Sequence, residues 1–231
     1  MGHITNYSNW TAWAGGPVLP TPYAVRTDFY ERLQYVHHQQ QQQQGNHGHD
    51  MVDVVSLPRP VDVSHFWPLP SDRRGVDRGG KNPNSLLRDS VSSTLDSLKK
   101  NMTTFVGLAG TANLVGRNSV EDAYPKALLE TKIVVVAQKD CHEEHYRLME
   151  ALVSGAMVMS DEMLSIPPDF TDGDALVFYH DMEDLRNKIY YYLGHSKERL
   201  EIARRGRHLA LSRHRSWHRM EQILFGQIMS T

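Results

Sequence analysis

Short apolar runs alternate with amphipathic stretches along the middle of the chain. Lys132–Ala137 is rich in β-branched residues, which is typical of a buried parallel strand. Apolar residues recur at helical spacing over Glu143–Ser154, and Gly155 can take the left-handed conformation that ends a helix. Ala156–Ser160 is a second apolar run. The pattern predicts a strand–helix–strand crossover whose loop, 138–142, lies where open α/β sheets bind ligands.

The same reasoning predicts elements on both sides of this crossover. Further strands are expected at 61–67, 103–107 and 175–179, and helices at 85–99, 122–130, 181–193, 196–214 and 216–228. Strands in the order 61, 103, 132, 156 and 175, each followed by a helix or turn, predict a doubly wound parallel (Rossmann-like) α/β sheet. We expect this domain to span residues 55–231.

The N-terminal region has a different composition. Residues 1–22 are rich in Gly, Pro, Asn and Trp, and Gln39–Gln44 are six consecutive glutamines. Such a polar tract buries too little apolar surface to fold by itself, so we expect residues 1–54 to be an irregular, disordered inter-domain segment. Histidines that could chelate a metal flank the tract, although low complexity produced by slippage is the interpretation we favour. They are His37, His38, His47 and His49.

Composition and charge exclude several classes of protein. The 231 residues are 40% hydrophobic and 23% charged, which is ordinary for a protein with one core, and the formal net charge of −2 does not favour a polyanion partner. With no long apolar run and no recognisable signal peptide, no membrane segment is expected, and the compartment stays open: cytoplasm, or Golgi within a longer protein. The single cysteine, Cys141, excludes an internal disulfide and a thiolate zinc cluster.

The predicted C-terminal helices hold most of the basic residues. Seven arginines lie between Arg199 and Arg219, and a polybasic helix can contact nucleic-acid phosphates. Interspersed glutamates such as Glu201 and Glu221 favour a solvated amphipathic helix packed on the sheet instead. We therefore expect no nucleic-acid partner.

One face of the predicted helix 143–154 carries polar chemistry. At about 100° per residue, Glu143, Arg147, Glu150 and Ser154 fall on one stripe. The stripe alone fits a crossover helix with a solvated face as well as it fits a binding site.

Arg88 follows a long basic loop, 68–84, on the helix predicted at 85–99. Its planar guanidinium can grip phosphate oxygens, and an ordinary helix-surface charge is the equal alternative. The Gly107–Gly110 segment lacks the G-x-G-x-x-G spacing of a pyrophosphate turn, so NAD binding is not expected.

The motif Glu150-Ala-Leu-Val-Ser-Gly155 resembles the donor-binding segment of retaining group 1 glycosyltransferases, in which an acidic residue precedes such a glutamate by eight positions. Here that first position falls on His142, with Glu143 one residue later. The closer resemblance is to the spore-maturation-protein-like branch, whose members end with an Arg/His-rich segment like Gly206–Arg219. The likeness covers about residues 55–226.

This resemblance implies the C-terminal half of a GT-B glycosyltransferase, with a nucleotide-sugar as donor substrate and no metal or other cofactor. The implied catalytic residues are His142 and Glu144, which would face the donor sugar, and the implied donor-binding residues are Glu150, Arg147, Arg88 and Glu143. Glu150 would accept hydrogen bonds from ribose hydroxyls, and the arginines would neutralise the diphosphate. The acceptor (a glycan, a protein or a small molecule) stays open.

Segment 18–30 resembles the inter-domain crossing of the same family, so the acceptor-binding half would precede it and we expect this chain to be incomplete as an enzyme. Two alternatives remain. One is a non-catalytic remnant or interaction domain of the same fold. The other is an exostosin-like transferase, whose donor segment shares Arg147-Leu-Met-Glu150.

Overall fold

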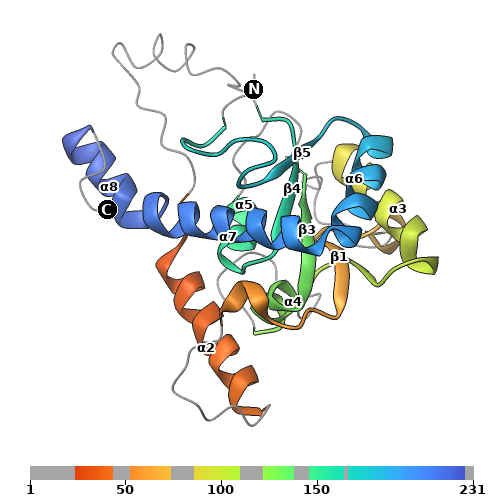
Figure 1. Ribbon diagram of the computed structural model, residues 1–231, viewed down its shortest axis with the longest axis horizontal. Coiled ribbons are helices and arrows are strands. Elements are labelled where there is room, and N and C mark those ends of the chain that lie inside the picture. The colour runs from red at the N-terminus through yellow and green to blue at the C-terminus, as the bar shows by residue number, and fades with distance from the viewer. Residues whose placement is uncertain are drawn as a thin grey trace.

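A computed structural model of the protein describes residues 24–43, 53–73, 86–109, 122–137, 146–163 and 166–226. Five strands form one sheet: β1 (Val61–His65), β2 (Thr104–Val106), β3 (Thr131–Val136), β4 (Met157–Asp161) and β5 (Val177–Tyr179). All neighbouring strands are parallel, and helices flank the sheet (Figure 1). The predicted Rossmann-like α/β fold class is confirmed.

The order of the strands differs from the sequence-based prediction. The sheet runs β2-β1-β3-β4-β5, so β1 lies between β2 and β3 rather than at an edge. The register places Val63 beside Thr104 on one side and beside Ile133 on the other. Apolar periodicity locates a strand, but it does not say on which side of β1 the chain crosses over, and for that reason the expected order was wrong.

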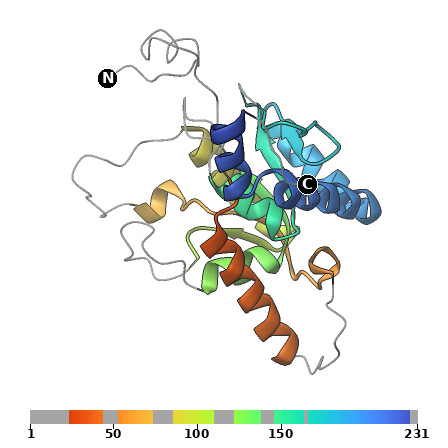
Figure 2. The same ribbon diagram turned by 90° about the vertical axis from the view of Figure 1, so that its left-hand side faces the viewer.

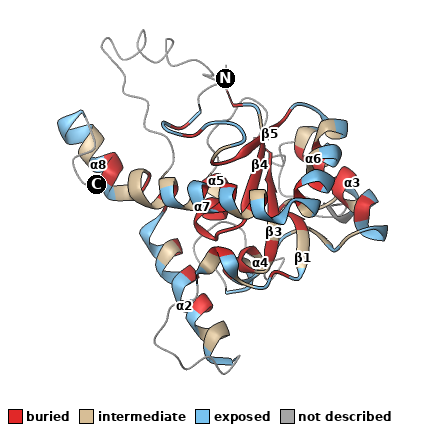
Figure 3. Cartoon of the chain, viewed as in Figure 1, coloured by how far each residue is buried: buried red, intermediate tan, exposed pale blue. Residues whose placement is uncertain are grey.

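Alternate residues of β3 pack into two separate cores. Val134 and Val136 belong to one apolar cluster, and Ile133 and Val135 belong to the other, on the opposite face of the sheet. Successive side chains of a strand point to opposite faces, so a strand covered on both sides needs apolar residues at every position. This is why the continuous run at 132–137 predicted β3 correctly, and every residue of β3 except Lys132 is buried (Figure 3).

Seven α-helices are described: α2 (Thr27–Gln43), α3 (Leu86–Ser97), α4 (Ala123–Leu129), α5 (Tyr146–Val153), α6 (Met182–Gly194), α7 (Ser196–Arg213) and α8 (Ser216–Phe225). Short 3-10 turns are η1 (Val54–Ser56), η2 (Pro70–Arg73) and η3 (Leu98–Lys100). Helices α2, α4 and α5 contribute to one apolar cluster, α3 and α6 to the other, and α7 to both. In the described part of the chain, none of these helices is both long and apolar enough to cross a membrane.

Over residues 27–43, helix α2 differs from the irregular segment expected for residues 1–54. Phe29, Leu33 and Val36 recur at helical spacing and are buried, and α2 packs against α4 and α5 (Figure 2). The polar tract does not fold by itself; part of it extends a helix whose first turns are held by tertiary contacts. Residues 1–23 and 44–52 lie outside the described residues, as do His47 and His49.

The beginning of α2 and the beginning of α8 lie side by side. Val25 forms an isolated parallel bridge with Arg215, and the Val25 backbone N–H donates to the His214 carbonyl at 2.7 Å. The hydroxyls of Thr27 and Ser216, 189 positions apart in sequence, are 3.0 Å apart. The two ends of the described fold are therefore joined directly.

Two positions show why the sequence folds locally as it does. The Asp181 carboxylate caps α6 by accepting from the backbone N–H groups of Glu183 and Asp184, as the predicted N-cap requires. Gly206 lets α7 approach the sheet, because a Cβ there would lie 2.3 Å from the Ala175 carbonyl oxygen. These contacts fix the helices that follow β5.

Candidate functional site

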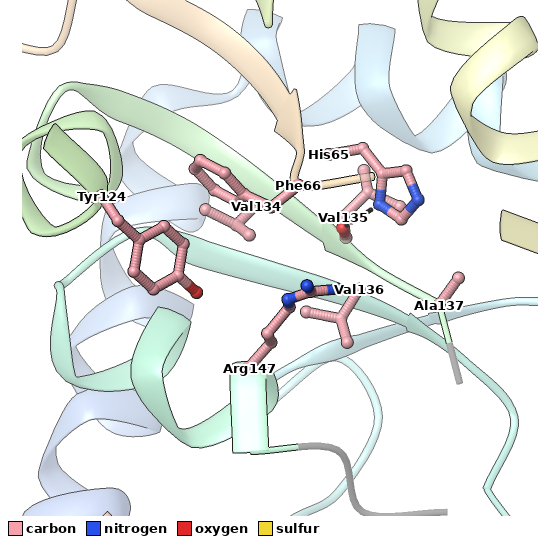
Figure 4. Close-up of a pocket in the computed structure, with 8 residues that line it drawn as sticks. All are labelled: His65, Phe66, Tyr124, Val134, Val135, Val136, Ala137 and Arg147. Carbon is pink, nitrogen blue, oxygen red and sulfur yellow. Dashed lines mark hydrogen bonds between the residues drawn. The ribbon is translucent and has the colours of Figure 1, made fainter. Parts of the chain in front are cut away.

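The strand order reverses at β1 and β3, which makes this part of the sheet a topological switch point. From β1 the chain crosses to β2 on one side, then returns through α4 to β3 on the other side. Parallel sheets form a crevice at such a switch point, outside the carboxyl ends of the strands. A hollow lies there (Figure 4), lined by His65, Phe66, Tyr124, Val134, Val135, Val136, Ala137 and Arg147.

The space enclosed by these residues is small. Its volume is about 10 Å³, which is close to the least that one water molecule needs. The loop 138–145 follows Ala137 directly and lies outside the described residues. The described side chains therefore form an inner wall of a site rather than a complete nucleotide cavity.

Glu150 is held just behind this wall by Tyr124. Glu150 lies on α5 and is 3% exposed, and its Oε2 accepts a hydrogen bond of 2.9 Å from the hydroxyl of Tyr124, which lies on α4. The Tyr124 ring packs edge-on against Phe66, with 5.0 Å between ring centroids. A buried carboxylate is stable only when it is hydrogen-bonded, so Tyr124 supplies a partner that Glu150 needs in this position.

Arg147 supplies positive charge to the same hollow. It lies in the first turn of α5, and its guanidinium points toward the carboxyl end of β3 (Figure 4). Its carbon Cζ is also 5.6 Å from the centroid of the Tyr146 ring. Arg147 and Glu150 thus approach the switch point from one helix, as their common stripe in the sequence suggested.

Arg88 is buried rather than exposed on a helix surface. It is 3% exposed, its Nε donates to the Ala137 carbonyl at 3.0 Å, and its guanidinium lies 4.9 Å from the centroid of the Trp67 ring. Trp67 in turn donates to the Asp89 carboxylate at 2.9 Å. Arg88 is therefore fixed beside the end of β3, next to the hollow that Arg147 lines.

His65 is a residue of this site that the sequence did not single out. It ends β1, is 3% exposed, and its Nδ1 is 2.8 Å from the Val135 carbonyl oxygen. Because a carbonyl only accepts, Nδ1 carries the proton. Burial lowers the pKa of His65 to about 4, and the charges of Arg147 and Arg88 act in the same direction. His65 is thus a neutral imidazole at pH 7.

Only the folded structure shows that Tyr124 and His65 line this hollow. His65 stands at the carboxyl end of an alternating strand, and Tyr124 opens the helix that returns the chain to β3. The remaining predicted site residues, His142, Glu143 and Glu144, lie outside the described residues, as does Cys141. Their assigned roles stay predictions. Within the described residues, no group of three or more His, Cys, Asp and Glu side chains is arranged to hold a metal ion.

The sequence profile of a family described as glycosyl transferase-like matches residues 92–225, more than half of the chain. This chain belongs to that family. The match supports the expected group 1 glycosyltransferase relationship, and the region matched in this glycosyl transferase-like chain includes Tyr124, Arg147 and Glu150. His65 and Arg88 precede it. A search of curated proteins gives no match.

Solved structures share the fold of this glycosyl transferase-like chain. Anabaena Alr3699/HepE in complex with UDP and glucose has a TM-score of 0.52 at 16% identity, over 94% of this chain and 59% of that one. The same protein with UDP-glucose has a TM-score of 0.51 at 16% identity, over 92% and 58%. A glycosyltransferase from Rickettsia africae ESF-5 has a TM-score of 0.50 at 11% identity, over 87% and 54%. This chain thus spans less than three fifths of each of these proteins.

Proposed function

We propose that this chain is the nucleotide-sugar-binding half of a GT-B glycosyltransferase and that it binds its donor at the β1–β3 switch point. The observation that carries the proposal is the hollow at the carboxyl end of β3, which Arg147 lines. Arg88 adjoins the hollow through the Ala137 carbonyl, and Glu150 adjoins it through Tyr124. Structures of HepE with UDP and with UDP-glucose support a uridine nucleotide as the first ligand to test.

The chemistry assigns a role to each group. The Glu150 carboxylate accepts hydrogen bonds from the ribose hydroxyls, since a carboxylate is an acceptor only. The guanidinium groups of Arg147 and Arg88 face the diphosphate, where negative charge grows as the sugar leaves for an acceptor hydroxyl. Fixed positive charges in a site partly closed to water stabilise that leaving group without a metal ion. His142 and Glu144 belong to the proposal as the groups that face the sugar.

The finer assignments are part of the same proposal. They are the spore-maturation-protein-like branch and an acceptor bound by a separate α/β half. The relatives support the last point, because HepE extends well beyond the region that this chain covers. Complete sugar transfer would then need both halves, whereas donor binding would need only this one.

Isothermal titration with UDP tests the donor site. The wild type should bind UDP, and Glu150→Ala should weaken binding by about tenfold or more, because a charged hydrogen bond is lost. Glu150→Gln keeps the shape and should weaken binding in the same direction. Glu201→Ala, on the exposed face of α7, is the matched control and should bind as the wild type does. UDP affinity that survives Glu150→Ala unchanged would remove Glu150 from the site.

The identity of residue 142 favours a second candidate function, a non-catalytic domain that keeps the ligand. His142 stands where the resembling transferases place an acidic residue. A donor hydrolysis assay separates the two candidates. If the wild type releases free sugar from UDP-glucose and His142→Ala does not, the result supports catalysis. If the wild type binds UDP but releases no sugar, the result supports the non-catalytic domain.

A further inference from the structure

A second cavity lies at the amino ends of the strands, whereas the proposed donor site lies at their carboxyl ends. Its volume is about 190 Å³, and it lies near the amino ends of β3 and β4, between η1 and α7. The polar residues that line it include Arg59, Lys132 and Arg199, and apolar lining comes from residues such as Leu200 and Ala203. Three cationic side chains therefore surround a space many times larger than the hollow at the switch point.

Arg59 is buried and has one N–H group without a partner. It is 8% exposed, and its Nη1 and Nη2 donate to four backbone carbonyls at 2.7–2.9 Å, those of Leu128, Thr131, Val54 and Ser154. Its Nε is buried and has no acceptor among the described residues. The carbonyls explain how Arg59 ties several elements together, and they fix its positive charge at the wall of the cavity while its fifth donor is enclosed by protein.

Arg199 is also buried and uses fewer of its donors. It is 9% exposed, and within the described residues it donates only through Nη1, to the carbonyls of Tyr192 at 2.8 Å and Leu193 at 3.4 Å. Its Nη2 and Nε therefore have no protein acceptor in that part of the chain. An arginine carries five donors in a planar fork, and the unused ones suit a second, oxygen-rich partner.

The nearest carboxylates are engaged by other cations. Asp53 pairs with Arg204 at 3.3 Å, and Asp62 pairs with Lys132 at 2.6 Å. Neither Arg59 nor Arg199 has a carboxylate partner among the described residues. Burial lowers the pKa of Arg59 to about 10, and the charge of Arg199 adds to the effect. The charges of Asp53 and Asp62 act on Arg59 and Arg199 in the opposite direction and offset part of this effect. Of the residues that the structure describes, three cationic side chains and no carboxylate line the cavity itself, which leaves an excess of positive charge there.

We propose that this cavity is a binding site for a small phosphate-class oxyanion, held by the Nε and Nη2 donors of Arg199 beside the buried charge of Arg59. Tetrahedral oxyanions match the guanidinium fork, and one such anion would accept from both remaining nitrogens of Arg199 at once. The apolar wall at Leu200 and Ala203 leaves room for a carbon body attached to the anion. The site is independent of the proposed donor site and does not depend on Glu150.

Thermal unfolding of the full chain in inorganic phosphate tests the proposal, against chloride at equal ionic strength. Phosphate should raise the Tm of the wild type, since a ligand that binds only the folded state stabilises it. Arg199→Gln should weaken the apparent phosphate affinity by about tenfold or more. Arg205→Gln, an exposed position on the same helix, is the matched control and should respond as the wild type does. A wild type without any response, or a full response in Arg199→Gln, would overturn the site.

A second pair of variants places the anion inside the protein. Leu200→Glu and Leu200→Gln lose the same apolar contacts, but only glutamate brings a carboxylate to the cavity. In phosphate-free buffer Leu200→Glu should have the higher Tm of the two and should not respond to phosphate, whereas Leu200→Gln should still respond. Equal Tm values together with equal phosphate responses would contradict the proposal even if Arg199→Gln does not fold.

Two further measurements define the ligand and separate the two sites. A sugar phosphate that raises the Tm at lower concentration than inorganic phosphate would show that the occupant carries a carbon body. An equal effect on the Tm would show that the free anion suffices, and both results support an oxyanion site.

Arg147→Gln should keep the phosphate response, and Arg199→Gln should keep UDP binding. Loss of the phosphate response in Arg147→Gln would assign the anion to the switch point and overturn the second site.

Discussion

The hydroxyl of Tyr124 donates a hydrogen bond of 2.9 Å to Glu150 Oε2, and this bond joins helix α4 to helix α5 beneath the switch point. The two residues lie 26 positions apart in sequence. One end of the pair contacts the hollow through Tyr124, and the other end is the carboxylate proposed to bind ribose. The orientation of Glu150 therefore depends on a residue of another helix.

Tyr124→Phe removes this hydrogen bond and keeps the ring against Phe66. We expect UDP affinity, measured by titration calorimetry, to fall about three- to tenfold, and the free energy of unfolding to fall by about 1 kcal/mol. Tyr190→Phe is the control, because Tyr190 is exposed and, within the described part of the chain, its hydroxyl accepts only from Asn101. UDP affinity equal to that of the wild type would show that Tyr124 does not position Glu150.

Arg147→Gln tests whether positive charge at the hollow acts on the diphosphate. UDP affinity should fall about tenfold or more, whereas the weaker binding of uridine, which has no phosphate, should change little. Arg186→Gln, at an exposed position on α6, should change neither affinity. An equal loss for UDP and uridine would place Arg147 against the nucleoside instead of the phosphates.

His65 predicts a loss of stability in mild acid. Its pKa is about 4 in the folded state because of burial, against about 6.5 when unfolded. The unfolded state therefore takes up the proton first, so the stabilisation is complete above about pH 6.5 and is lost as the pH falls toward 4. Urea unfolding at pH 7 and pH 4.5 should show that His65→Asn reduces the pH-dependent loss by about 2–3 kcal/mol.

Two observations check the source of that loss. His214, whose pKa burial also lowers to about 4, should leave part of the acid sensitivity in place in the His65→Asn variant. His208→Gln, at an exposed position on α7, should retain the full sensitivity of the wild type. An unchanged pH dependence in His65→Asn would mean that His65 does not stay neutral in the folded protein.

Gly206→Ala should destabilise the packing of α7 on the sheet. The added Cβ would lie 2.3 Å from the Ala175 carbonyl oxygen and 2.8 Å from a methyl carbon of Leu152, so backbone must shift. We expect a loss of about 1–3 kcal/mol in chemical unfolding. Gly194→Ala has no neighbour within 4 Å and should stay within about 0.5 kcal/mol of the wild type. Equal stabilities of the two variants would contradict the close approach.

Phe29→Ala tests whether α2 belongs to the folded unit. Phe29 is fully buried, and its removal should cost about 3–5 kcal/mol of unfolding free energy if α2 is part of the core. Tyr35→Ala, on the same helix but 49% exposed, should cost far less. Similar small effects in both would return residues 27–43 to the irregular segment that composition alone predicted.

The strands and the crossover were predictable because a strand that is buried on both faces of the sheet needs a continuous apolar run, as in 132–137. The cap at Asp181 was predictable because a carboxylate at that position satisfies the first N–H groups of a helix. Helix α2 was not, since its apolar residues are sparse and its polar tract signals disorder until α4 and α5 cover one face. The position of β3 beside β1 could not be predicted, because local periodicity does not show on which side of β1 the chain returns to the sheet.

The candidate site was predictable only in part. Arg147 and Glu150 share a helix, so their common stripe is visible in the sequence. Arg88 could be named but its burial against Ala137 and Trp67 could not, because both contacts span different elements. His65 and Tyr124 reach the hollow only through the order of the strands, which the sequence did not reveal.

The bridge between Val25 and Arg215 makes the two extremes of the fold depend on each other. Shortening the protein from either end past this point removes the hydrogen-bond partner of the opposite end, so stable fragments should begin before Val25 and continue beyond Arg215. Bringing Val25 and Arg215 together closes a long loop, and this costs chain entropy before the contacts between them form. We therefore expect α2 to dock slowly and late during folding. A circularly permuted chain that links these neighbouring ends and opens elsewhere should fold faster.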